Sequence, residues 1–171
     1  MATLIVLSGL PASGKSTLAR RLAQESGAVW LRIDSMDQAI RESGVVPGDL
    51  KDVSYRAAYA VAGDNLRLGR DVVADSVNDR KVTRDAWRAA GLAAGARVLE
   101  VEVICSDAGE HRWRVESRTS EVPGLVLPDW AAVTAAAPEP WDREHLIVDT
   151  AGRGLEDCVQ LIRDARDGPQ A

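Results

Sequence analysis

The sequence predicts an α/β fold, a three-layer sandwich in which a five-stranded parallel sheet has helices on both faces. Two observations predict it. Short apolar runs alternate along the chain with segments whose apolar residues recur at helical spacing, the pattern of βαβ units. The first run, residues 4–7, is continuously apolar, which is typical of parallel strands buried on both faces. With 171 residues, the chain is expected to form a single domain, 1–171.

Each element follows from its local pattern. Strands are expected at residues 4–7, 28–33, 71–75, 97–105 and 145–148. Helices are expected at residues 14–25, 35–42, 52–68, 83–94, 108–117 and 154–164. Turns are expected at Ser43-Gly44 and at Pro47-Gly48-Asp49. The proline-rich stretch 121–141 fits neither period, so the sequence predicts a loop there, with a short helix at 129–135 and anchors at Trp130 and Trp141.

Composition excludes some classes of partner. The net charge of −5 argues against a protein that coats nucleic acid or an anionic membrane, because such binding needs a broad excess of Lys and Arg. No segment approaches the roughly 20 apolar residues of a membrane span. The N-terminus lacks the basic leader and cleavage site of a signal peptide. We therefore expect a soluble, cytoplasmic protein.

Residues 9–16, Gly-Leu-Pro-Ala-Ser-Gly-Lys-Ser, match the phosphate-loop pattern GxxxxGK[ST]. Glycines let successive backbone amides converge on a phosphate, the lysine reaches the β- and γ-phosphates, and the serine hydroxyl ligates Mg²⁺. The apolar strand before the loop and the amphipathic helix after it supply the required context; the alternative is a Gly-Pro turn before an ordinary helix. The sequence thus predicts ATP and Mg²⁺, with these nucleotide-binding residues: Gly9, Leu10, Pro11, Ala12, Ser13, Gly14, Lys15, Ser16 and Thr17.

The rest of the chain favours phosphoryl transfer over hydrolysis. There is no NKxD motif of a GTPase, and the strand ending at Asp75 continues with Ser-Val-Asn rather than with a water-orienting Glu. Asp34 follows the second predicted strand, where a carboxylate can take the proton of an attacking hydroxyl as general base. The alternative is that Asp34 only caps the helix that begins at Ser35.

A basic helix is the candidate lid. Arg114 and Arg118 are four residues apart, so they share one helix face and can neutralise the charge of a transferring phosphate as catalytic residues. The proline-rich loop that follows allows movement, so the lid is expected to span about 107–141. The alternative is an ordinary solvated charged helix.

Further polar residues are expected near the acceptor. Asp75 and Asn78 follow the third strand, and ligands of open parallel sheets collect at the carboxyl ends of strands. Asp75 is a candidate for the Mg²⁺ shell together with Ser16, and Asn78 for substrate contact, with a simple turn as the alternative. Asp37 and Arg41 either line an acceptor pocket or form an exposed pair at i, i+4.

Together, Gly-Leu-Pro-Ala-Ser-Gly-Lys-Ser-Thr17, Asp34, Val-Val-Ala-Asp-Ser-Val-Asn78, Thr-Arg-Asp-Ala-Trp87 and the Arg114/Arg118 pair resemble the small P-loop kinases labelled "predicted kinase" or AAA-type ATP-binding domain. Relatives are the polynucleotide 5′-kinase domain, chloramphenicol phosphotransferase, gluconate kinase and zeta toxins. The resemblance, over about residues 1–120, implies phosphate binding by Lys15, a general base at Asp34, a lid arginine at Arg118 and an adenine site beside Arg153.

The function expected from the sequence is an ATP-dependent phosphotransferase that moves the γ-phosphate to a hydroxyl of a small molecule. A polynucleotide 5′-hydroxyl kinase is the first alternative, although the acidic composition weakens it. The second alternative is an ATP-binding switch or ATPase without an acceptor. The resemblance does not identify the acceptor.

Overall fold

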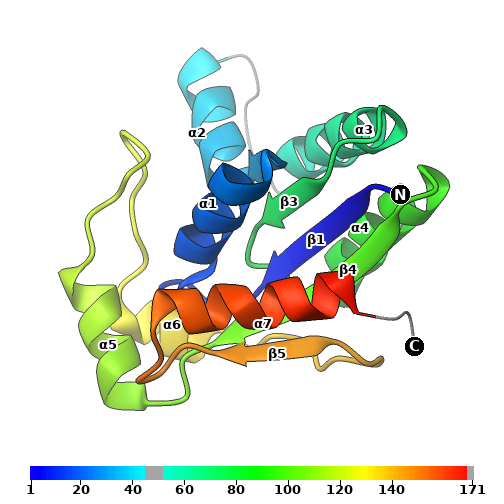
Figure 1. Cartoon of the computed structure of the whole chain (residues 1–171). Helices are drawn as coiled ribbons and strands as arrows, with labels where there is room; N and C mark the ends of the chain where they lie inside the picture. The colour runs from blue at the N-terminus through cyan, green and yellow to red at the C-terminus, as the bar shows by residue number, and fades with distance from the viewer. Residues whose placement is uncertain (45–51, 169–171) are drawn as a thin grey trace.

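The computed structural model describes residues 1–44 and 52–168, in which strands and helices alternate (Figure 1). The strands are β1 (Thr3–Ser8), β2 (Val29–Arg32), β3 (Val72–Asp75), β4 (Arg97–Ile104) and β5 (Leu146–Asp149). The helices are α1 (Lys15–Ser26), α2 (Ile33–Ser43), α3 (Val53–Arg67), α4 (Lys81–Ala93), α5 (Ala108–Ser117), α6 (Trp130–Ala135) and α7 (Leu155–Asp167). Across these residues no helix is long and apolar enough to cross a bilayer.

Within the described residues, five strands form one sheet in the order β2-β3-β1-β4-β5, and every neighbouring pair is parallel. This confirms the predicted α/β class and its parallel sheet. β1 lies in the middle, between β3 and β4, and all six of its residues are buried. The loops that follow β1, β2 and β3 therefore leave the same edge of the sheet, where ligands of such sheets bind.

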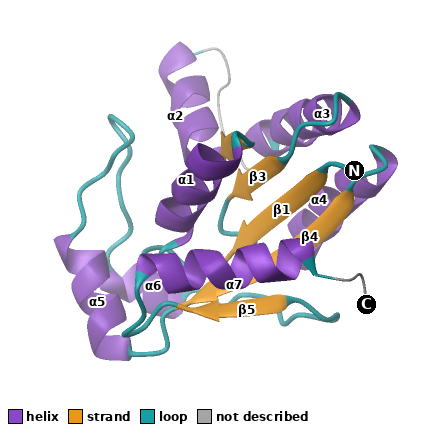
Figure 2. Ribbon diagram, viewed as in Figure 1, coloured by secondary structure: helices purple, strands orange, loops and turns teal. Residues whose placement is uncertain are grey.

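The two faces of the sheet carry separate apolar cores. Side chains alternate between faces along a strand, so Leu4 and Val6 of β1 join a core that also holds Trp87 of α4 and residues of α3. Ile5 and Leu7 point the other way, into a core shared with α1 and α7. Figure 2 shows α1 and α7 in front of the sheet, with α3 and α4 behind it. This arrangement is the expected three-layer sandwich.

Some element bounds differ from the sequence-based expectation. Helix α2 begins at Ile33, two residues before the expected Ser35, because the chain turns directly out of the extended Arg32 into the helix. Helix α4 begins two residues early, and α7 continues three residues beyond Asp164. The expected turn after Ser43 is present, with Gly44 in the left-handed region at φ 64°. The second expected turn, at residues 47–49, lies outside the described residues.

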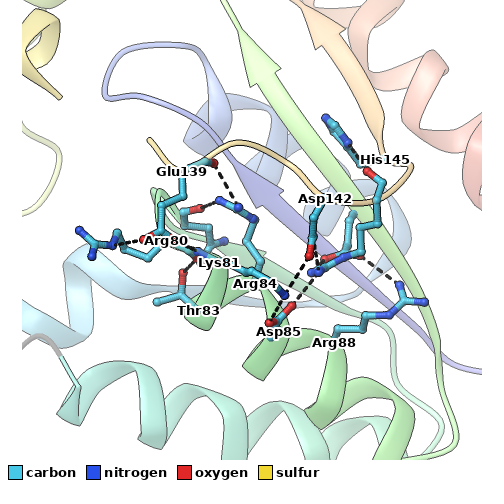
Figure 3. A network of polar contacts seen from close by, with 12 residues as sticks. Arg80, Lys81, Thr83, Arg84, Asp85, Arg88, Glu139, Asp142 and His145 are labelled. Atoms are coloured by element: carbon cyan, nitrogen blue, oxygen red, sulfur yellow. Dashed lines mark hydrogen bonds and ion pairs between the residues drawn. The ribbon is translucent and has the colours of Figure 1, made fainter. Parts of the chain in front are cut away.

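The segment from α6 to β5 is fixed against α4 (Figure 3). The buried guanidinium of Arg84 donates to the backbone carbonyls of Asn78, Glu139 and Pro140, and it lies 4.6 Å from the ring of Trp141. Trp141 also stacks on His145, with ring centroids 4.0 Å apart, and the Arg143 guanidinium lies 5.8 Å from its ring. Trp141 therefore anchors this segment, as the sequence predicted.

The same segment is tied to the sheet by a buried ion pair. Arg143 donates to Glu100 of β4 at 2.5 and 2.7 Å and to Asp85 of α4 at 2.6 Å. Glu100 is nearly inaccessible to solvent and receives a further hydrogen bond from Arg88 at 3.0 Å. These contacts join the segment before β5 to β4 and to α4, which are far from it in the sequence.

Candidate active site

The predicted phosphate loop connects the central strand β1 to helix α1. Gly9 and Gly14 adopt φ values of 142° and 104°, and Ala12 is also left-handed at 63°. The Gly9 amide donates to the Val77 carbonyl at 2.9 Å, which fixes the start of the loop against the end of β3. Helix α1 begins at Lys15 without a side-chain cap, so its first amides remain available to an anion.

Lys15 is almost fully buried, at 7% exposure, and its ammonium donates to the Leu10 carbonyl at 2.8 Å. Burial lowers the pKa of Lys15 to about 8, although the nearby carboxylates of Asp75 and Asp34 act in the opposite direction. A buried ammonium with one neutral acceptor is destabilised, and an approaching anion would relieve that cost. Lys15 is therefore placed and charged for a phosphate.

Asp75 closes β3 beside this lysine. It is 3% exposed, and burial raises the pKa of its carboxyl, whereas Lys15 and a hydrogen bond from the Ser16 hydroxyl act to lower it. The indole nitrogen of Trp30 donates to the same carboxylate at 3.3 Å. A serine hydroxyl in contact with a carboxylate is a donor set that suits Mg²⁺, so Ser16 and Asp75 fit the predicted metal.

Asp34 lies within the first turn of α2, and its side chain is exposed to the cleft. The residue at the N-cap position is Arg32, so the alternative that Asp34 serves only as the helix cap is wrong. Asp34 is close enough to Lys15, Asp75 and Arg118 to perturb the pKa of each. The structure thus brings the candidate base beside the phosphate loop.

The two candidate lid arginines, Arg114 in α5 and Arg118 directly after its last residue, have different surroundings. Arg114 donates to the hydroxyl and the carbonyl of Thr150 and to Glu110, at 2.7, 3.0 and 2.6 Å. By contrast, Nε and Nη2 of Arg118 are buried without a hydrogen-bond partner in the described structure, and burial lowers the pKa of its guanidinium while Asp34 raises it. Of these two arginines, Arg118 is the one that has unpartnered donors in the described structure, and both arginines line the same cleft.

Helix α5 is also attached to the phosphate loop by residues that the sequence did not reveal. His111 donates from Nε2 to the Pro11 carbonyl at 2.8 Å. Thr150 receives the hydrogen bond from Arg114, and its own hydroxyl lies 2.9 Å from the Ser13 carbonyl. Helix α5 is thus hydrogen-bonded to the loop, and the lid expected at residues 107–141 stays a prediction. Residues 118–128, between α5 and α6, form an arm beside the cleft (Figure 1).

These groups line a cleft of about 730 Å³ at the carboxyl edge of the sheet. Of the residues expected from the sequence, Asp37, Arg41 and Arg153 also line it. Asn78 does not. Its side chain is buried, and its amide nitrogen donates to the Leu7 carbonyl at 3.1 Å, so it supports the end of β1, and its contact with substrate stays a prediction. The residues of the cleft are Pro11, Ala12, Gly14, Lys15, Ser16, Thr17, Leu18, Arg32, Asp34, Asp37, Arg41, Asp75, Ser76, Val77, Trp113, Arg114, Ser117, Arg118, Thr119, Ser120, Glu121, Leu125, Val126, Leu127, Pro128, Thr150, Arg153, Leu155 and Cys158.

Known proteins resemble this chain in sequence. A protein family described as an AAA domain matches residues 4–136. A cytidylate kinase of Exiguobacterium sibiricum is 27% identical over 95% of this chain and 80% of its own length. An uncharacterized protein of Mycobacterium tuberculosis is 31% identical, and the chain spans about a third of its length (35%).

Solved kinases share the fold. The APS kinase of Mycobacterium tuberculosis, determined in complex with AMPPNP and APS, superposes with a TM-score of 0.67 at 18% identity, covering 98% of both chains. A gluconokinase of Sinorhizobium meliloti gives a TM-score of 0.61 at 22% identity, covering 96% of this chain and 94% of its own. At these identities the likeness shows a P-loop kinase fold.

Proposed function

Because the chain belongs to this AAA domain family and has a P-loop kinase fold, we propose that it is an ATP-dependent phosphotransferase with a small-molecule hydroxyl as acceptor. One observation carries the proposal. Lys15, Asp34 and Arg118 come from three separate segments, yet they line one cleft, where burial lowers the pKa of both Lys15 and Arg118 and Asp34 acts to raise it. Hydrolysis alone would need a group that orients water, whereas transfer needs a base, a phosphate clamp and room for an acceptor.

The nucleotide would lie along the phosphate loop, with its β-phosphate on the amides at the start of α1. Lys15 would exchange the Leu10 carbonyl for the β- and γ-phosphates. Arg118 would direct its two unpartnered nitrogens to the γ-phosphate, and Arg153 would lie beside the adenine of the nucleotide. Ser16 and Asp75 would hold Mg²⁺, which supplies further neutralisation of the phosphate charge.

Asp34 would act as general base. Its carboxylate accepts the proton of the acceptor hydroxyl while the hydroxyl oxygen forms a bond to the γ-phosphorus and the bond to the β-phosphate oxygen breaks, releasing ADP. Arg118 and Lys15 neutralise charge on the transferring group. Arg114 would act through Thr150 by positioning the phosphate loop and not by contact with the nucleotide.

The test separates binding from transfer. Lys15→Ala should lose most of the ATP affinity measured by calorimetry, because the phosphates lose their cation. Asp34→Asn should bind ATP normally and transfer labelled γ-phosphate at least about 100-fold more slowly, the usual contribution of a general base. The acceptor panel should include sugars, sugar acids, antibiotics, CMP and oligonucleotide ends.

Asp64→Asn is the matched control, since that carboxylate is exposed on α3 and does not line the cleft. Normal transfer by Asp34→Asn would remove Asp34 from the mechanism, and unchanged ATP binding by Lys15→Ala would contradict the nucleotide site. Transfer to CMP or to oligonucleotide ends in preference to small hydroxyl compounds would replace the proposed acceptor class.

A further inference from the structure

Arg32 is a cation of the cleft that the proposed transfer step leaves unused. It is the last residue of β2, it lines the cleft, and its side chain is 17% exposed. In the described structure its Nε is buried without a hydrogen-bond partner, and its Nη1 reaches Glu121 at 3.4 Å. A guanidinium offers five N–H donors in a planar fork that suits a carboxylate or a phosphate, so most of the hydrogen-bond donors of Arg32 are available to a ligand.

The buried carboxylate of Asp75 does not accept a hydrogen bond from Arg32. Nε of Arg32 lies 3.9 Å from Asp75, which is beyond hydrogen-bonding distance. The Asp75 carboxylate is already engaged by the Trp30 indole and the Ser16 hydroxyl. Arg32 therefore faces the cleft as a partly desolvated cation with one long hydrogen bond, to Glu121, among the described residues, and such a group favours an anion that can form more hydrogen bonds to it.

In the described structure the carboxylate of Glu121 contacts Arg32 where such an anion would bind. It lies on the 118–128 arm, is half exposed, and bridges Arg32 to Arg20 of α1, with 2.8 Å to the Arg20 guanidinium. Glu121 and Arg20 are both about half exposed, and the contact of Glu121 with Arg32 is long, so a ligand can displace the carboxylate from Arg32 at small cost. The arm also reaches α2 at its tip, where Gly124 lies close to Gln38.

From these contacts we infer that the phosphate acceptor carries an anionic group, a carboxylate or a phosphate, which binds Arg32 in place of Glu121. The inference rests on the proposed transfer reaction. Arg32 precedes Asp34 by two residues and both line the same cleft, so one small molecule can present its anion to Arg32 and its hydroxyl to Asp34. Arg118 is left for the nucleotide.

The experiment compares pairs of acceptors of which one member carries an anionic group and the other does not. Calorimetry on the full chain first measures AMPPNP with Mg²⁺, and then measures the second ligand on the AMPPNP-loaded protein. The probes are gluconate against glucitol, glycerate against glycerol, and glucose 6-phosphate against glucose, so that the panel also separates a carboxylate from a phosphate. Four variants are compared with the wild type: Arg32→Gln, Arg32→Lys, Glu121→Gln and, as matched control, Arg20→Gln, which loses the same glutamate but does not line the cleft.

We expect at least tenfold tighter binding of the charged member of one pair, and a loss of at least tenfold in Arg32→Gln, as hydrogen bonds to a charged group imply. AMPPNP affinity should not change in Arg32→Gln, and Arg32→Lys should restore part of the binding if the fold is intact. Glu121→Gln should bind the charged probe about two- to fivefold more tightly, because its competitor is gone. Arg20→Gln should show no loss.

Equal binding of charged and neutral members, or no binding that depends on Arg32 across the panel, would overturn the inference. So would an Arg32→Gln variant that loses AMPPNP affinity, since Arg32 would then serve the nucleotide. Unchanged binding in Glu121→Gln would contradict the displacement of that carboxylate. Failure of the wild type to bind AMPPNP would instead contradict the proposed function.

Discussion

At the scale of single residues, Gly9 shows how closely the phosphate loop is fitted to the sheet. A Cβ at this position would lie 2.1 Å from the Val103 carbonyl, and the φ value of 142° is rarely adopted by other residues. The sequence predicted that glycine lets the loop curl. The contact with β4 could not be predicted, because Val103 is 94 residues further along the chain and approaches only through strand pairing.

Gly9→Ala should therefore lower the free energy of unfolding by at least about 2 kcal/mol, since the strain of the backbone adds to a clash with a carbonyl that cannot move freely. Urea unfolding measures the loss, and calorimetry should show weaker ATP binding. Gly27→Ala is the control. Gly27 is also left-handed, at 71°, but its Cβ would meet open space, so about 1 kcal/mol is expected. Equal losses in the two variants would contradict the role given to the Val103 contact.

Which site residues could be predicted depends on how local their signal is. Lys15 and Ser16 lie in a motif whose geometry is set by neighbours in the chain, so the sequence located them. Arg32 and Glu121 gave no signal, because their pairing joins the end of β2 to the arm after α5. Asn78 was assigned to substrate from its place after β3, but its amide turns back to the Leu7 carbonyl.

At the scale of elements, α5 forms a wall of the cleft and is hydrogen-bonded to the phosphate loop and to Thr150. Thr150 is the centre of its attachment: it receives a hydrogen bond from Arg114, and its hydroxyl lies within 3.0 Å of the Ser13 and Ile104 carbonyls. The bounds of α5 agree with the sequence-based expectation, residues 108–117. Its attachment could not be predicted, since a charged helix with alternating acids and arginines has the same pattern when it faces solvent.

Thr150→Val should lower the free energy of unfolding by about 1–3 kcal/mol, because the substitution preserves shape and leaves a donor of Arg114 without an acceptor. ATP affinity should fall as well, since the Ser13 carbonyl loses its hydrogen bond. Both quantities can be measured by urea unfolding and calorimetry. Thr134→Val serves as control, because that exposed hydroxyl contacts only its own helix, and a change within about 0.5 kcal/mol is expected. An unaltered stability in Thr150→Val would show that α5 is not held by this residue.

At the scale of the whole molecule, the alternation of apolar runs and amphipathic segments was enough to predict the layers. The order of the strands was not predicted, because it depends on which strands pair across long stretches of sequence. The ion pairs that tie the segment between α6 and β5 to the sheet were not predicted either. In them Arg143 contacts Glu100 of β4 and Asp85 of α4. These partners are 43 and 58 residues away, and no local pattern marks them.

Arg143→Met should destabilise the protein by about 3 kcal/mol, because Glu100 stays buried with Arg88 as its remaining partner. Thermal or urea unfolding measures this. The double variant Glu100→Leu with Arg143→Met should recover part of the loss, since no uncompensated charge remains. Arg67→Met, which breaks an exposed pair with Asp64, should cost less than about 1 kcal/mol. A similarly small loss of stability in Arg143→Met would mean that the ion pair between Arg143 and Glu100 does not stabilise the fold.

The position of β1 has a consequence for the rates at which the protein folds and unfolds. Its neighbours are strands that pair with it from 68 and 94 residues away, so the central strand is completed only after long stretches of chain have closed. The phosphate loop takes its shape from that strand, and a nucleotide has little to bind until then. Nucleotide should accordingly extend the lifetime of the folded protein while leaving its rate of formation nearly unchanged.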